Sequence, residues 1–141
     1  MEFDEVVKRR KMIREYDLDR RRIPDNIITK LIRNARRAPS AGHTQVQEFI
    51  IVKDASTKKK LRKAAVNQEY VEQASLLIVV CSNTSRSISR YGSPEREFYS
   101  IIDGVFASIM LILISAVNEG IGACLWEHSR IPKYQRYLSG Q

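Results

Sequence analysis

The sequence has 141 residues, a length that suits one domain with a real hydrophobic core, and its 43% hydrophobic and 28% charged residues are ordinary for a globular protein. This composition argues against a disordered chain, and no apolar run reaches the roughly 20 residues that a membrane helix needs. The formal net charge of +8 fits a solvated helix face, a nucleic-acid surface or a pocket for a phosphorylated ligand, and charge alone does not choose among them.

The N-terminus and the cysteines indicate the cellular compartment. Residues 1–5 lack the basic and apolar stretches of a signal peptide, which predicts a cytoplasmic protein. Cys81 and Cys124 stand in apolar contexts without CxxC spacing. We therefore expect two core thiols and neither a disulfide framework nor a metal site.

Two helices are expected in the N-terminal third. Apolar residues recur at helical spacing over residues 3–12, and Asp4 and Glu5 lie in the first turn, where the helix dipole favours negative charge. The last turn of this helix is strongly basic. Pro24 is well placed to open a second helix, whose apolar stripe runs over residues 27–35.

The rest of the chain alternates short apolar runs with helices. Strands are predicted at residues 49–52, 76–81 and 121–126, a helix from Asp54 to 65, and a long helix from about 96 to 118. The long helix is apolar nearly all round, which favours burial against a sheet, with contact to a second subunit left open. This order predicts an α/β-type layered domain. Residues 127–141 show no clear periodicity.

Three blocks stand in order along the sequence: the basic run at 8–16, the Ala-Pro-Ser-Ala-Gly-His-Thr-Gln segment at 38–45, and residues 98–103 at the start of the long helix. In their order and spacing, these blocks resemble the nitroreductase family of flavoenzymes. The resemblance covers about residues 3–126. It implies an α/β (α+β) fold, a three-layer sandwich with a mixed central sheet flanked by helices. Residues 1–126 would form the FMN-binding domain and residues 127–141 an atypical tail.

The resemblance also implies a cofactor site. The residues expected to contact the phosphate and ribityl chain of FMN are Arg10, Lys11 and Arg14. A phosphate with about −1.5 to −2 charges suits such a group of cations, and the planar fork of arginine matches its oxygens. The alternative interpretation is that these three side chains are merely solvated.

A second set of residues is implied to line the flavin itself. It consists of Pro39, Ser40, His43 and Gln45, with the Pro-Ser turn donated by the other subunit of a homodimer. Asn67, or its neighbour Gln68, could hold the uracil edge. A structural role for His43 and a surface amide at Asn67 remain the alternatives.

In activity, the resemblance implies an FMN-dependent oxidoreductase that passes electrons from NAD(P)H to a nitroaromatic, quinone or similar small-molecule acceptor. The flavin carries this chemistry, so no catalytic side chain is expected. The alternatives are a flavin-binding protein without turnover and a basic nucleic-acid-associated protein, for which no helix-turn-helix or RNA-binding signature is present.

The sequence departs from the family pattern at several positions. Met12 stands where a serine is usual, Val46-Gln47 where Pro-Trp is common, and Met110 where an asparagine is usual. After Trp126 the expected flavin loop, helix and closing strand are not recognisable, so the C-terminal part of the fold is expected to be missing. Three explanations are open: a short variant completed by its dimer partner, a disrupted end, or a fold kept without the flavin.

Overall fold

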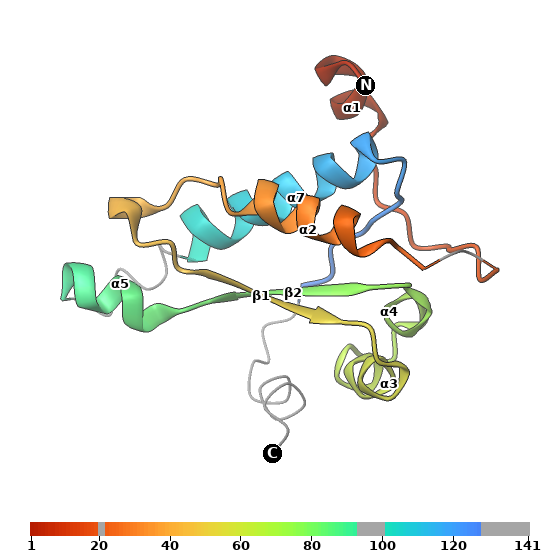
Figure 1. The fold of residues 1–141 in the computed structure, drawn as a ribbon. Helices are drawn as coiled ribbons and strands as arrows, with labels where there is room; N and C mark the ends of the chain where they lie inside the picture. Colours follow the sequence, from red (N-terminus) through yellow and green to blue (C-terminus); the bar gives the residue numbers. More distant parts are fainter. Residues whose placement is uncertain (20–21, 93–100, 128–141) are drawn as a thin grey trace.

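The computed structural model describes residues 1–19, 22–92 and 101–127. Within these residues the chain forms short helices and two strands (Figure 1). In chain order the elements are α1 (Phe3–Arg9), α2 (Asp25–Ala35), the 3-10 helix η1 (Ala41–His43), β1 (Gln47–Val52), α3 (Ala55–Ala64), α4 (Glu69–Gln73), β2 (Leu77–Ser82), α5 (Thr84–Tyr91), the π-helix η2 (Ile101–Phe106) and α7 (Ala107–Asn118).

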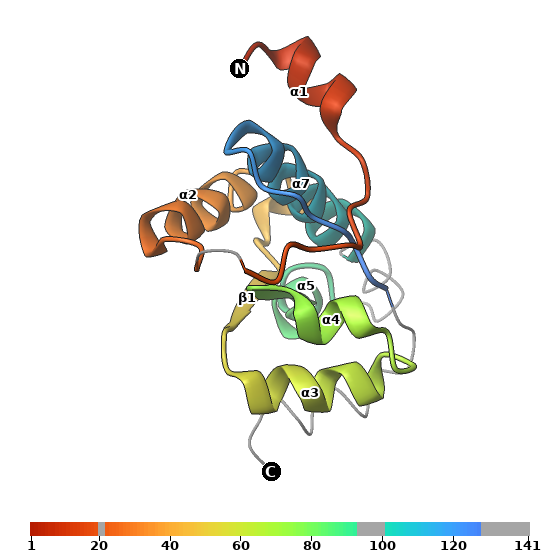
Figure 2. The same cartoon turned by 90° about the vertical axis from the view of Figure 1, so that its right-hand side faces the viewer.

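These elements pack in three layers. Strands β1 and β2 form the middle layer, α2 and α7 run side by side over one face of it, and α3 lies on the other (Figures 1 and 2). The expected layered α/β sandwich is therefore confirmed. None of the helices within the described ranges combines the length and the apolar character that crossing a membrane requires.

The strand register fixes the two ends of the sheet. β1 and β2 pair antiparallel, with Gln47 opposite Ser82 at one end and Val52 opposite Leu77 at the other. Helix α5 follows the first end, and α3 and α4 connect the strands at the second. At about 3.4 Å per residue, six-residue strands hold these ends roughly 17 Å apart.

Two groups of apolar contacts hold the layers together. The predicted stripe of α2 buries Ile28, Leu31 and Ala35, and α2 packs against α7, where the Asn34 side-chain amide donates to the Ser115 hydroxyl at 3.0 Å. On the other face of the sheet is a cluster of Val52, Leu61, Ala65 and Val71, with Tyr70 and Trp126 packed against it.

Several predicted boundaries were wrong. The first helix ends at Arg9 rather than residue 12, because Arg10 adopts an extended conformation and carries the basic run out of the helix. Helices α4 and α5 were not predicted, since both are short and polar. Residues 96–100, where the long helix was expected to begin, lie outside the described residues, as do 128–141 of the expected tail.

The prediction of a third strand was also wrong. Residues 121–126 make a single parallel bridge, between Met12 and Ala123, instead of a strand. A strand needs a partner of similar length, and in the described part of the chain the neighbouring segment offers only this bridge. The end of the segment packs Trp126 against the α3 and α4 cluster instead.

Candidate functional site

The basic segment after α1 runs alongside residues 121–125. The Ile13 N–H donates to the Ala123 carbonyl at 3.0 Å, and the Leu125 N–H points at the Met12 sulfur at 3.3 Å. Met12, which stands where the family usually has a serine, is thus used to join the two segments. These contacts hold the cations on either side of Met12 on an extended backbone at the molecular surface.

Three cations of this segment lack carboxylate partners among the residues that the structure describes. Arg10 is half-buried and Lys11 and Arg14 are exposed, and none of the three forms an ion pair with a carboxylate within the described residues. By contrast, Arg9, Lys30, Lys53, Arg62 and Arg86 are all ion-paired. Unpaired, clustered cations at fixed positions are what an anionic ligand requires.

Tyr16 anchors the end of the basic segment, a role that sequence reasoning missed. Its hydroxyl lies 3.3 Å from the Cys124 sulfur. Burial raises the pKa of the Tyr16 phenol, the contact with Cys124 raises it further, and Arg14 opposes both effects. The phenol therefore stays neutral at ordinary pH. Both cysteines are half-buried free thiols rather than the core thiols that were expected.

The loop that contains Ser40, His43 and Gln45 is held in an unusual backbone conformation. His43 and Gln45 have φ of 55° and 49°, in the left-handed region that non-glycine residues rarely adopt. The Gln45 N–H donates to the Ser40 hydroxyl oxygen at 2.9 Å, and the Arg86 guanidinium donates to the Gln45 carbonyl at 2.8 Å. The side chains of Pro39, His43 and Gln45 are exposed.

Asn67 shows the same unusual backbone. It lies in the turn between α3 and α4 with φ of 58°, next to Val66 with φ of 54°. Together with His43 and Gln45, these two are the non-glycine residues with positive φ in the described part of the chain. Asparagine tolerates this conformation, whereas it is uncommon for His43 and Gln45 and costs energy at a β-branched residue such as Val66. Three of the four residues belong to the set assigned to the flavin by resemblance.

A single chain does not bring together all of the residues that were predicted to contact FMN. The Tyr16 phenol is near Tyr70 of α4, which places the end of the basic segment beside the turn that holds Asn67. The loop with His43 instead lies at the α5 end of the sheet, as Figure 1 shows. The cations and Asn67 are thus at one end, and the second block is at the other.

The residues that replace the usual Pro-Trp are buried. Val46 is 0% exposed and Gln47 7% exposed. A Cβ atom on Gly104 would lie 2.7 Å from a methyl group of Val46, so η2 packs closely on this position. The Gln47 side-chain oxygen has no hydrogen-bond partner in the described residues. The side chains of Val46 and Gln47 therefore pack inside the protein and are not exposed on the loop that contains His43 and Gln45.

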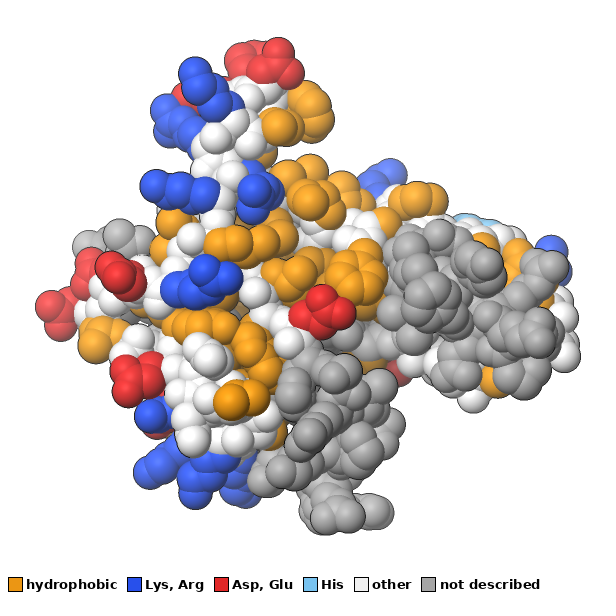
Figure 3. Space-filling model, turned by 180° about the vertical axis from the view of Figure 1, so that it is seen from behind, with side chains coloured by type: hydrophobic (Ala, Val, Ile, Leu, Met, Phe, Trp, Pro, Cys, Tyr) orange, Lys and Arg blue, Asp and Glu red, His pale blue; other side chains and the backbone are white. Residues whose placement is uncertain are grey.

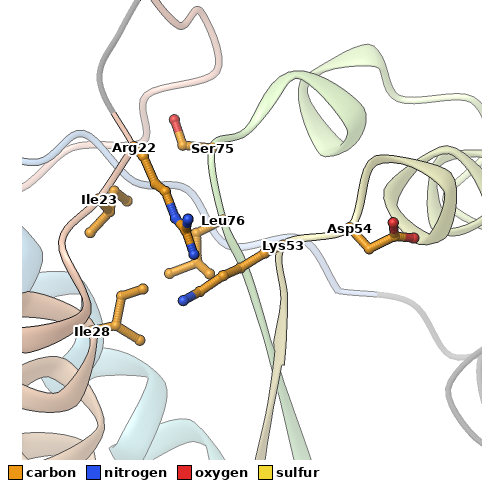
Figure 4. A pocket seen from close by; sticks show the side chains of 7 residues that line it. All are labelled: Arg22, Ile23, Ile28, Lys53, Asp54, Ser75 and Leu76. Atoms are coloured by element: carbon orange, nitrogen blue, oxygen red, sulfur yellow. The ribbon is translucent and has the colours of Figure 1, made fainter.

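A cavity of about 370 Å³ lies at the α3 end of the sheet (Figure 4). The head groups of Arg22 and Lys53 point toward each other there, whereas Asp54 turns toward α3. The Lys53 ammonium pairs with Asp25 at 2.6 Å, and Asp54 caps α3. These charges take part in contacts within the protein, and the positive and negative charges nearly balance. The cavity therefore has little net charge with which to bind a charged ligand. Its remaining lining residues are Ile23, Ile28, Ser75 and Leu76.

Comparison with known proteins gives consistent matches. The profile of the nitroreductase family matches residues 7–69. An NADH dehydrogenase of Thermus thermophilus is 32% identical over 81 residues, which cover 57% of this chain and 38% of the relative. A protein of Archaeoglobus fulgidus, provisionally assigned as an NADH dehydrogenase/NAD(P)H nitroreductase, is 29% identical over 116 residues, which cover 82% of this chain and 66% of the relative.

Among solved structures, a Parabacteroides distasonis protein with the same provisional assignment superposes with a TM-score of 0.77 at 25% identity, covering 96% of this chain and 74% of that one. The present chain therefore matches less than two thirds of the length of either curated relative.

Proposed function

Because the chain belongs to the nitroreductase family, we propose that it is a flavin-dependent oxidoreductase that binds FMN and passes electrons from NAD(P)H to a nitroaromatic, quinone or similar acceptor. The flavin, when bound, would supply the redox chemistry. The chain's own residues would hold its phosphate, orient its ring and leave one face open to the acceptor.

The observation that carries the proposal is the group of cations that have no carboxylate partner within residues 1–19, 22–92 and 101–127. Arg10, Lys11 and Arg14 lie on one extended segment, fixed through Ile13 and Tyr16, and they have no internal charge to neutralise in the described part of the chain. A bound phosphate would supply the negative charge that these cations lack. Each charge-assisted hydrogen bond to it would contribute about 1.5 to 3 kcal/mol. The turn that holds Asn67 lies at the same end of the sheet as Tyr16, which ends the basic segment.

We further propose a homodimer that completes the site. The second block lies at the opposite end of the sheet from the cations, so in this arrangement His43 and Gln45 would reach the flavin held by the partner. Exposed apolar side chains support association: Phe3 is 69% and Met110 50% exposed, on helices α1 and α7 that contact each other. Figure 3 shows apolar side chains gathered below α1 on that face.

The experiment that tests the proposal begins with a visible-range spectrum of the purified protein, before and after addition of FMN and removal of unbound flavin. Retained flavin absorbance, together with NAD(P)H oxidation that depends on an added nitro compound or quinone, is the expected result. Retained FMN without acceptor reduction would instead identify a flavin-binding protein without turnover. Failure to retain FMN would refute the proposed cofactor.

A further inference from the structure

A second hollow, of about 510 Å³, lies between the 42–44 loop and helix α5. We call it the α5 pocket. The residues that line it are Gly42, His43, Thr44, Arg86, Ser89 and Arg90. None of these is acidic, and α5 itself, with the sequence Thr-Ser-Arg-Ser-Ile-Ser-Arg-Tyr, carries no carboxylate. The walls of this pocket are therefore cationic and polar.

The two arginines differ in how they are used. Arg86 donates to the Gln45 carbonyl at 2.8 Å and to the Glu48 carboxylate at 3.0 Å, so its position is fixed and its charge is partly neutralised. Arg90 lies one helical turn further along α5, is exposed, and forms no ion pair in the described part of the chain. Among the described residues, the Arg90 charge is therefore not neutralised by a carboxylate.

The loop that forms the opposite wall is held in a fixed position. Gly42 has φ of 57°, and a Cβ atom on it would lie 2.0 Å from the Tyr91 hydroxyl, so this part of the loop rests directly on the end of α5. The Arg86 bond to Gln45 ties down the far side of the loop. Because both walls are fixed before a ligand arrives, little ordering entropy is lost on binding.

These features point to an anionic ligand. We infer that the α5 pocket binds the phosphate or carboxylate group of a molecule that reacts at the flavin. The guanidinium fork of Arg90 matches either anion, and the Ser89 hydroxyl can donate a further bond. A hollow of this size accepts a ring that bears one acidic group.

The inference rests on the proposed function in one respect only. His43 lines the α5 pocket and also belongs to the loop that we assign to the flavin of the partner subunit. A ligand held here would therefore be next to the flavin. Two sources of the anion are compatible with this position: a phosphate of the reduced nicotinamide nucleotide and a carboxylate of the electron acceptor.

Two pairs of small probes distinguish these sources without requiring turnover. The first pair is 2′,5′-ADP and adenosine, and the second is 4-nitrobenzoate and 4-nitrobenzamide. Binding is measured at low salt through backbone amide NMR shifts, which also report whether residues 42–44 and 86–90 respond. We expect the anionic member of one pair to bind at least about tenfold more tightly than its neutral partner, because a charge-assisted bond is worth about 1.5 kcal/mol or more.

Variants then test the assignment to Arg90. Arg90→Gln should remove most of the preference for the anion, and Arg90→Lys should restore part of it. Lys59→Gln, which removes an exposed cation from α3 in another layer, should leave the preference unchanged. A thermal melt of each variant checks that it folds.

Two outcomes would overturn the inference: equal binding of anionic and neutral probes in both pairs, or a preference that survives Arg90→Gln. A parallel titration with FMN separates this result from the fate of the proposed function. If FMN binds and the anion preference is absent, only the pocket assignment fails. If the preference is present and FMN does not bind, the anion site stands, and the flavin assignment fails together with the claim that the ligand reacts at the flavin.

Discussion

Gly42 shows how a single residue determines the shape of the loop between α2 and β1. Its left-handed backbone and its contact with Tyr91 leave no room for a side chain. We expect Gly42→Ala to destabilise the protein by more than the 1–2 kcal/mol or so that left-handed backbone alone costs an alanine. Urea unfolding monitored by circular dichroism would measure the change.

Gly92→Ala is the matched control for this change. Gly92 has φ of 65°, close to that of Gly42, but a Cβ atom there would meet nothing within 4 Å in the described part of the chain. Its substitution therefore reports the cost of backbone strain without the contact. Equal losses of stability in the two variants would show that the packing of the loop on Tyr91 is unimportant.

The cations of the basic segment make a second prediction for single residues. If Arg10 and Arg14 hold a phosphate, then Arg10→Ala or Arg14→Ala should raise the Kd for FMN by roughly 10- to 150-fold, the equivalent of one charge-assisted bond of about 1.5 to 3 kcal/mol. Fluorescence titration of FMN measures this. Arg33→Ala, on exposed α2 surface, should leave the Kd unchanged. FMN binding as tight as the parent's in both variants would refute the phosphate assignment.

At the scale of elements, the sequence predicted the helices and strands that carry a clear pattern within their own residues. α2 has an apolar stripe, α3 has an Asp54 cap, and β1 and β2 are short apolar runs, so each was found within a few residues of its observed bounds. Helices α4 and α5 were missed because five or eight mostly polar residues carry too little periodicity. The strand expected at 121–126 failed for a different reason: apolar composition does not supply a pairing partner.

The cap of α3 makes a prediction about acid stability. The Asp54 carboxylate accepts hydrogen bonds from the side chains of Thr57 and Ser56 and from the Thr57 N–H, and these lower its pKa to about 2. A carboxyl whose pKa is lower in the folded state stabilises the fold above its unfolded pKa of about 3.9. That contribution is lost as the pH falls from about 4 to about 2, so the free energy of unfolding should decrease over this range.

Asp54→Asn tests the cap because asparagine also caps helices but does not titrate. The variant should lose part of the pH dependence between about 4 and 2 when unfolding is measured in urea at several pH values. Some dependence should remain, since Lys53 and Lys30 lower the pKa values of Asp25 and Glu119. Asp19→Asn, outside any helix, is the control. An unchanged pH profile in Asp54→Asn would contradict the assigned role.

At the scale of the whole molecule, the sequence could group residues by resemblance but could not place them. Arg14 and Gln45 belong to one predicted site, yet in the structure they are associated with opposite ends of a sheet roughly 17 Å long. The supporting contacts, such as Tyr16 with Cys124, join residues more than a hundred positions apart and leave no local signal. The same holds for Arg90, which reaches the loop only because α5 folds back on it.

A shared site in a homodimer predicts that two defective subunits can repair each other. One parent variant carries Arg14→Ala, in the cation half. The other carries His43→Asn and Gln45→Asn, in the loop half; asparagine shortens the side chain at Gln45 and tolerates the left-handed backbone at both positions. Each variant alone should retain FMN poorly. The two variants are unfolded together and refolded at equal concentrations, so that half of the dimers are mixed. Each mixed dimer has one intact site and one site with both defects. About a quarter of all sites should therefore bind FMN normally. A mixture that binds no more FMN than the average of its two parents would show that each subunit builds its site alone.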